Sequence, residues 1–294
     1  MPEGIAGPGG APRAAQPAVR GGTPGFERPP EVPWSELGED FIETWGHDAH
    51  GKLRAEHWEI EGQSGSGKSY LAATAMQQRA ERWDSGIIAL VTKQTDDSIP
   101  LLGWPVTATW QDLRRYRQAV FWPTTTAKGA EREKYHESVI FDLLSRLWPD
   151  PGEVANIVLY LDEIRYLESL SPRLKKLVRM YWREGRSHGI SIIAGAQRPL
   201  EMGRDMHSET RWRSVFCPAD EADMERFAEL LGKHQDWEPV LRDLDQTRHE
   251  FVHRNSFTRD AYISWIDREL KPVASQAQQK PEPATVYGRK AAAA

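Results

Sequence analysis

Short apolar runs alternate with segments of helical periodicity through the middle of the chain. Apolar residues at helical spacing mark 68–83, 131–148 and 172–185. The strand-like runs span 55–62, 86–91, 119–122, 156–163 and 189–196. Alternation of this kind predicts parallel βαβ units, and so an α/β fold with a mostly parallel sheet between helices. Two later runs, at 249–255 and 261–267, are rich in aromatic and β-branched residues and predict a C-terminal β-hairpin.

The two ends of the chain differ in composition from its middle. Residues 1–33 hold eight prolines and seven glycines, and residues 271–294 are also poor in large apolar groups. Such segments bury too little apolar surface to offset the entropy lost on ordering. We therefore expect a disordered Pro/Gly-rich tail over 1–33, one folded domain over 34–270 and a flexible tail over 271–294.

Composition narrows the class of protein. The 294 residues include a single cysteine, Cys217, which excludes an internal disulfide framework and a zinc cluster built on several thiolates. No apolar stretch approaches the roughly 20 residues of a membrane-spanning helix. We expect a cytoplasmic protein with no membrane partner.

Charge is distributed unevenly along the chain. The net charge is −5, yet residues 171–217 hold ten Lys/Arg against four Asp/Glu. This surplus indicates either a surface that faces a polyanion or a solvated basic helix.

A phosphate-binding motif lies between the first predicted strand and the helix that follows it. It reads G-x-x-x-x-G-K-S and comprises Gly62, Gln63, Ser64, Gly65, Ser66, Gly67, Lys68 and Ser69. Glycines allow the backbone to curl around a phosphate, and the following helix presents its positive N-terminus to it. Lys68 is expected to reach the β- and γ-phosphates of ATP, and the Ser69 hydroxyl to bind Mg²⁺.

Two carboxylates end a second buried strand. The apolar run 157–161 is followed directly by Asp162 and Glu163. The carboxyl ends of parallel strands meet at one edge of a sheet, so both acids are expected beside the phosphate loop. Asp162 is expected to hold Mg²⁺ through water, and Glu163 to polarise the attacking water.

A third motif follows the acidic pair. Residues 185–199 read G-R-S-H-G-I-S-I-I-A-G-A-Q-R-P. This resembles the GR-x-x-G-I, apolar run and Q-R-P pattern of the FtsK/HerA family of DNA-pumping ATPases, which includes viral packaging motors. Phe41 and Trp45 resemble the F-x-x-x-W lead-in of its stand-alone phage and plasmid members. The likeness covers about 41–235.

The resemblance implies a P-loop fold of the additional-strand, RecA-like type and ATP hydrolysis with Mg²⁺. It also implies a ring of five or six copies that surrounds double-stranded DNA and can dock on a viral portal or another protein, in the host cytoplasm if the chain is viral. By position, Gln197 matches the family's γ-phosphate sensor, and Arg186 matches the arginine finger that serves the neighbouring subunit.

Three other functions remain open. They are a plasmid-transfer or chromosome-pumping motor, a nucleotide-controlled scaffold that does not translocate, and a zinc peptidase. The last rests on His249-Glu250-Phe251-Val252-His253, which matches H-E-x-x-H. The two histidines can share one ion on a helix, whereas on the predicted hairpin strand they are too far apart.

The first predicted strand departs from the usual pattern. It carries Glu56, Glu59 and Glu61, whereas a central parallel strand is usually almost entirely apolar. Its register in the sheet is therefore not determined by the sequence.

Overall fold

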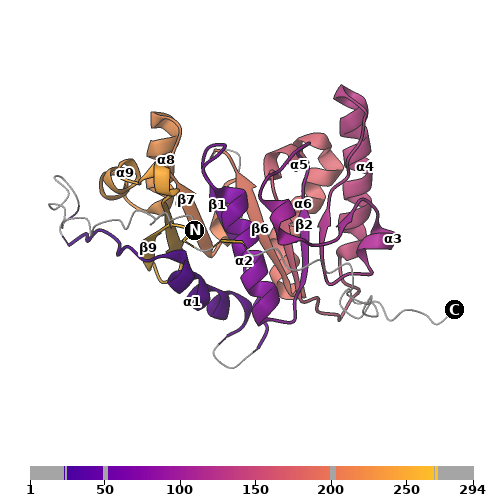
Figure 1. Ribbon diagram of the computed structural model, residues 1–294, viewed down its shortest axis with the longest axis horizontal. Helices are drawn as coiled ribbons and strands as arrows, with labels where there is room; N and C mark the ends of the chain where they lie inside the picture. Colours follow the sequence, from indigo (N-terminus) through magenta and orange to yellow (C-terminus); the bar gives the residue numbers. More distant parts are fainter. Residues whose placement is uncertain (1–22, 24, 49–51, 199–202, 268, 271–294) are drawn as a thin grey trace, which may run out of the picture.

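A nine-stranded sheet forms the centre of the molecule (Figure 1). The structure is a computed structural model that describes residues 23, 25–48, 52–198, 203–267 and 269–270. The strand order is β3-β4-β2-β5-β6-β1-β7-β8-β9. The strands are β1 (Trp58–Glu61), β2 (Gly86–Leu90), β3 (Val106–Thr107), β4 (Gln118–Phe121), β5 (Ile157–Leu161), β6 (Ile190–Ala196), β7 (Trp212–Phe216), β8 (Phe251–Asn255) and β9 (Ala261–Ser264).

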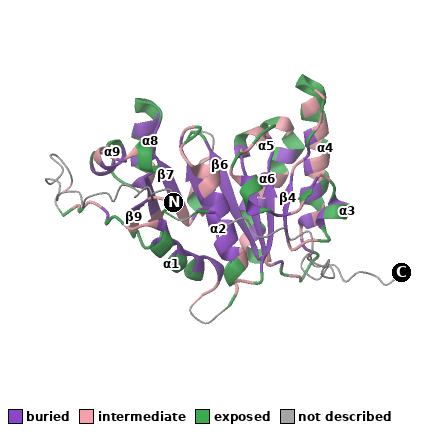
Figure 2. Ribbon diagram, viewed as in Figure 1, coloured by how far each residue is buried: buried purple, intermediate pink, exposed green. Residues whose placement is uncertain are grey.

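The sheet is parallel from β3 to β7, and only β8 and β9 are antiparallel to their neighbours. The predicted α/β class and the C-terminal hairpin are both confirmed. The sequence analysis missed β7, which lies between β1 and β8. All residues of β5 and β6 are buried, as expected for strands covered on both faces (Figure 2).

Helices cover both faces of the sheet. On one face, α1 (Trp34–Gly46) and α2 (Lys68–Arg82) pack on alternate strand residues such as Ile87 and Ile60. On the other, α4 (Gly129–Leu147), α5 (Ile164–Leu170) and α6 (Pro172–Glu184) pack on Ile88 and Leu159. The other elements are α3 (Trp110–Leu113), α7 (Arg204–Glu209), α8 (Glu221–Leu231), α9 (His234–Arg242), η1 (Ile99–Leu102), η2 (Gly185–His188) and η4 (Gln246–Arg248).

The acidic strand β1 lies at the centre of the sheet despite its charges. Glu59 is fully buried and pairs in register with Ala194 of β6 and Arg213 of β7. Its carboxylate accepts hydrogen bonds from Arg213 Nε at 2.8 Å and Thr210 Oγ1 at 2.7 Å. Burial alone raises the pKa of Glu59, but Arg213 and these donors outweigh it and lower the pKa. The charge of Glu59, one of the three that left the register of β1 open, is thus paired with Arg213 of the neighbouring strand.

Glu61, two residues further along β1, is protonated more readily than an ordinary carboxyl. It is fully buried, and neither carboxylate oxygen has a hydrogen-bond partner among the described residues. Burial, together with the charge of Glu59, raises the pKa of Glu61.

The folded part begins before residue 34. Phe26 packs edge-on against Trp237 with 5.5 Å between ring centroids, and Arg28 Nη1 lies 2.8 Å from Asp243 Oδ2. Residues 25–33 of the expected tail therefore lie against the domain. The remainder of that tail, residues 1–22 and 24, and the expected tail over 271–294 lie outside the described residues.

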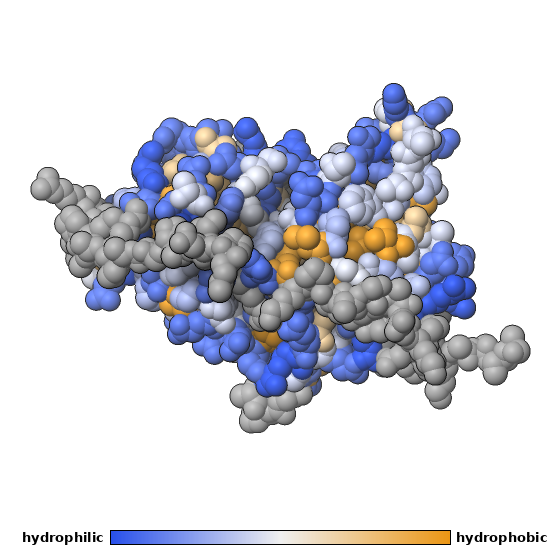
Figure 3. Space-filling model, viewed as in Figure 1, coloured by the Kyte–Doolittle hydropathy of each residue, from blue (hydrophilic) through white to orange (hydrophobic). Residues whose placement is uncertain are grey.

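The face of the molecule seen in Figure 3 is mostly hydrophilic, with smaller apolar patches near the middle of the view. Among the described residues, none of the helices combines the length and the apolar character that a membrane crossing requires.

Candidate nucleotide-binding site

The phosphate loop joins the carboxyl end of β1 to the first turn of α2. Gly62 and Gly67 adopt positive φ angles of 149° and 103°, and Gly67 directly precedes the helix. A Cβ atom at Gly62 would lie 2.7 Å from Phe216 Cβ, so both space and conformation require glycine there. The loop has the strand–loop–helix context that the motif predicts.

Lys68 points back across the loop. Its Nζ donates hydrogen bonds to the carbonyl oxygens of Gly62 at 2.6 Å and Gln63 at 2.7 Å. The ammonium group therefore lies inside the curl of the loop, where it can contact the phosphates of a bound nucleotide.

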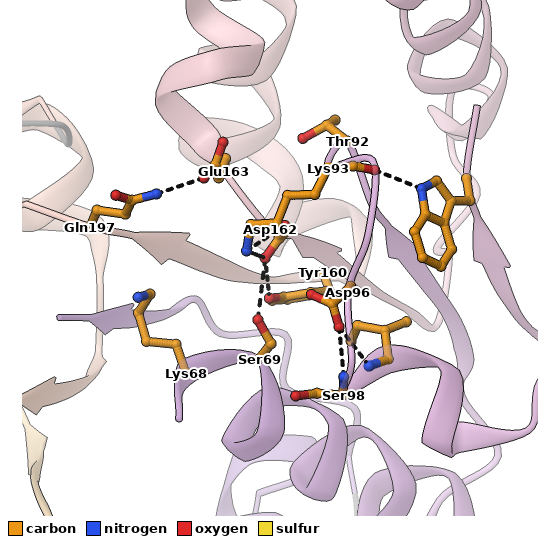
Figure 4. A network of polar contacts seen from close by, with 12 residues as sticks. Lys68, Ser69, Thr92, Lys93, Asp96, Ser98, Tyr160, Asp162, Glu163 and Gln197 are labelled. Carbon is orange, nitrogen blue, oxygen red and sulfur yellow. Dashed lines mark hydrogen bonds and ion pairs between the residues drawn. The ribbon is translucent and has the colours of Figure 1, made fainter. Parts of the chain in front are cut away.

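Asp162 forms the centre of a polar network at the end of β5 (Figure 4). The carboxylate is buried, and its Oδ1 accepts hydrogen bonds from Tyr160 OH at 2.8 Å and Ser69 Oγ at 3.5 Å. A carboxylate next to a serine hydroxyl offers the hard oxygen ligands that Mg²⁺ prefers. Ser69 and Asp162 therefore fit a Mg²⁺ site.

Glu163 contacts the end of the next strand. Gln197, the first residue after β6, donates from Nε2 to Glu163 Oε1 at 2.7 Å (Figure 4). The adjacent parallel strands β5 and β6 bring this pair together. A carboxylate beside the phosphate loop can accept a proton from water, and the amide of Gln197 holds it in place.

The phosphate loop borders a pocket of about 700 Å³, a volume within the usual range for small ligands. Asp162 and Glu163 lie next to this pocket, because their partners Ser69 and Gln197 line it. Its lining includes Gly67, Lys68, Ser69 and Gln197 from the predicted site. His249 and Ile266, from the C-terminal part of the chain, line the same pocket.

Lys93 lies beside the acidic network and was missed by the sequence analysis. Its Nζ lies 3.0 Å from both carboxylate oxygens of Asp162. The backbone at this point is fixed, because Trp122 Nε1 donates to the Lys93 carbonyl at 2.8 Å and Arg132 Nη2 to the Thr92 carbonyl at 2.9 Å. The site therefore places a second cation near the phosphate loop.

Tyr160 is another residue that the sequence analysis did not single out. It is two positions before Asp162, so both side chains point to the same face of β5. Burial, and then the negative charge of Asp162, raise the pKa of the phenol, which therefore stays protonated and donates to the carboxylate.

Arg186 lies far from this pocket. It belongs to η2, ahead of the amino end of β6, and its Nη2 lies 2.8 Å from Glu209 Oε2. Gln197 follows the other end of the same strand, about 20 Å away at the rise of an extended chain. The structure thus places Arg186 at the opposite edge of the sheet from its own phosphate loop.

The H-E-x-x-H residues lie in a turn and the strand that follows it, rather than on an α-helix. His249 has a left-handed backbone with φ 52° and precedes β8, whereas His253 lies within β8. His253 is buried, and its Nδ1 lies 2.8 Å from Ser214 Oγ. The two imidazole rings therefore have different surroundings. They lack the helical spacing with which the two histidines of a zinc peptidase share one ion.

No protein-family model and no curated protein matches the chain. Solved structures do. The DNA-packaging ATPase B204 from Sulfolobus turreted icosahedral virus is 15% identical, with a TM-score of 0.51 over 72% of this chain and 98% of that chain. The genome packaging NTPase B204 from Sulfolobus turreted icosahedral virus 2, in complex with AMPPCP, is 14% identical, with a TM-score of 0.54 over 73% and 99%. EssC (ATPases 2 and 3) from Geobacillus thermodenitrificans is 14% identical, with a TM-score of 0.50 over 79% and 44%.

At these identities the likeness establishes the fold. The chain has the α/β fold of P-loop ATPases of the additional-strand type, as predicted. The expected resemblance to FtsK/HerA-type ATPases is confirmed at the level of the fold.

The Tyr160 hydroxyl is expected to position Asp162 for Mg²⁺. Tyr160→Phe removes one donor to a charged group, a hydrogen bond that contributes about 1.5–3 kcal/mol. Binding of a fluorescent ATP analogue in Mg²⁺ should weaken roughly tenfold. Binding measured in EDTA should be unchanged, and an equal loss in both conditions would show that the substitution damages the loop itself.

Proposed function

We propose that the chain is an ATP-hydrolysing ring motor that translocates double-stranded DNA, and that it serves as a viral genome-packaging ATPase. The observation that carries this proposal is the convergence of the phosphate loop, Asp162, Glu163 and Gln197 at one edge of the sheet. The chain shares its fold with nearly all of a viral DNA-packaging ATPase, and this supports double-stranded DNA as the substrate.

Each side chain at this edge has a role in ATP hydrolysis. Lys68 and the loop amides bind the phosphates, and Ser69 and Asp162 hold Mg²⁺, which neutralises charge on the phosphates. Glu163 takes a proton from the attacking water. Gln197 bonds to Glu163 at 2.7 Å, so a change at the γ-phosphate that moves Gln197 also moves the base.

Arg186 completes the site of a neighbouring copy in this proposal. It cannot reach its own pocket from the opposite edge of the sheet, whereas in a ring each copy presents that edge to the next. A closed ring of five or six copies, docked on a portal or another protein, gives every pocket one arginine.

Two alternatives use the same pocket differently. A plasmid-transfer or chromosome-pumping motor has the same chemistry with another docking partner. An assembly scaffold binds nucleotide without translocating DNA, and it needs neither a general base at Glu163 nor an arginine finger at Arg186.

Duplex DNA is expected to stimulate the ATPase. We expect the rate of phosphate release to rise when duplex DNA binds. The concentration of DNA needed should rise steeply with salt, because DNA that binds through a local basic surface releases counterions. Phosphate release from the assembled protein, measured with and without duplex of mixed sequence, tests this. An unchanged rate would favour the scaffold.

A further inference from the structure

The outer face of α6 carries a stripe of cations. The helix buries Leu174, Val178, Tyr181 and Trp182 against the core. The opposite face carries its basic residues, which are Arg173, Lys175, Lys176, Arg179 and Arg183. Lys175, Arg179 and Arg183 are four residues apart, so they lie on one face at steps of about 6 Å.

A groove of about 270 Å³ runs between this stripe and α7. Its lining includes four cations, Lys175, Lys176, Arg179 and Arg183, and no carboxylate among the residues that the structure describes. Trp182 and Met206 contribute apolar surface, and Trp182 is fixed there because its Nε1 donates to the Met206 carbonyl at 2.9 Å. The groove is therefore a positively charged concavity in which the position of Trp182 is fixed.

One carboxylate balances part of this charge. Glu168 Oε1 accepts from Arg179 Nε at 2.9 Å, and Glu168 Oε2 lies 3.9 Å from Lys175 Nζ. Lys176 and Arg183 are exposed, and neither has an acidic partner among the described residues. Within the described part of the groove, four cations share a single carboxylate, which leaves a positive field on a chain whose net charge is negative.

The geometry of the stripe suits a row of phosphates. Lys175 to Arg183 spans about 12 Å along the helix axis, and one DNA strand carries a phosphate about every 3.4 Å of duplex axis. Long cationic side chains on such a stripe can follow a phosphate backbone without reading bases. A single free anion would occupy only part of it.

We propose that the groove between α6 and α7 binds the phosphate backbone of duplex DNA. This inference rests on the proposed function and identifies the surface of the protein that contacts the DNA. Lys176 and Arg183 supply contacts to phosphates, and Trp182 and Met206 form the floor. Because all of these contacts are to the backbone, binding is independent of base sequence.

The test measures binding of a short fluorescent duplex of mixed sequence to the full chain with ATPγS present. The groove variant is Lys176→Gln/Arg183→Gln. The matched control, Arg114→Gln/Arg115→Gln, removes the same charge from two exposed arginines at the end of α3. Binding is followed by anisotropy at several salt concentrations, and the size of the assembly by sedimentation.

The groove variant should bind duplex about tenfold more weakly or worse, and its slope of log affinity against log salt should fall by about 2, one for each lost phosphate contact. The control should bind as the wild type does, and all three proteins should bind ATPγS equally. Three results would contradict the groove as the DNA-binding surface. They are equal losses in both variants, no loss in either, and a loss explained by failure of the groove variant to assemble. If the wild type itself does not bind duplex, the proposed function fails together with it.

Discussion

Glu163→Gln is expected to abolish ATP turnover while leaving ATP binding intact. The substitution keeps the size of the side chain and can still pair with Gln197, which lies 2.7 Å from the carboxylate. It removes the group that accepts the proton from water, and general-base catalysis contributes roughly 10²–10⁴ in rate. We therefore expect phosphate release to fall by that factor.

Two measurements separate this loss from damage to the pocket. The affinity for a fluorescent ATP analogue should match that of the wild type, because Lys68 and the loop amides supply the ground-state contacts. Glu131→Gln, an exposed glutamate in the first turn of α4, is the matched control and should hydrolyse normally. Undiminished turnover in the Glu163→Gln protein would show that another group activates the water.

Arg186→Ala subunits are expected to bind ATP normally and to hydrolyse almost none. Arginine fingers contribute roughly 10³–10⁵ in rate, because they neutralise charge that develops in the transition state. Arg186 lies at the edge of the sheet opposite its own phosphate loop, so its contribution goes to a neighbour. Mixing these subunits with Lys68→Ala subunits should restore part of the activity, because some interfaces then combine an intact Lys68 site with an intact Arg186.

The ion pair of Arg186 provides the control. Arg186 Nη2 lies 2.8 Å from Glu209 Oε2 in a half-exposed pair, and such pairs contribute only about 0–1 kcal/mol to stability. Glu209→Gln breaks the same pair but keeps the guanidinium, so it should retain hydrolysis. If Glu209→Gln is as inactive as Arg186→Ala, the arginine has a structural role. No rescue despite subunit exchange, confirmed with labelled subunits, would show that Arg186 does not complete a neighbour's site and would contradict the ring mechanism.

The strands that hold the site could be predicted because they are buried on both faces. Five consecutive buried apolar residues form β5, and the acids that follow it lie beside the phosphate loop as expected. Gln197 was identified through the family resemblance, and it meets Glu163 because the carboxyl ends of parallel strands share one edge. Periodicity and motif spacing were sufficient here because each is a local property of the sequence.

The parts that were missed depend on contacts between distant residues. In β7, Arg213 and Ser214 interrupt the apolar pattern, yet both are buried. Arg213 is tolerated because it pairs with Glu59 of β1. The burial of both charges can therefore be understood only when β1 and β7 are known to be adjacent. Lys93 had a usable signal, because it follows the strand-like run 86–91 by two residues and therefore lies at the same edge as Asp162. The sequence carried no such signal for His249, because η4 brings this residue to the phosphate loop from the far end of the domain.

A triplex-displacement assay tests the central claim, movement along duplex DNA driven by ATP, most directly. A third strand annealed to a duplex is released when a motor passes along that duplex. The assembled wild-type protein with ATP and Mg²⁺ is predicted to release the strand, and the Glu163→Gln protein is predicted to release none. Full DNA-stimulated hydrolysis without release of the third strand would contradict the motor and leave an ATPase that does not move on DNA.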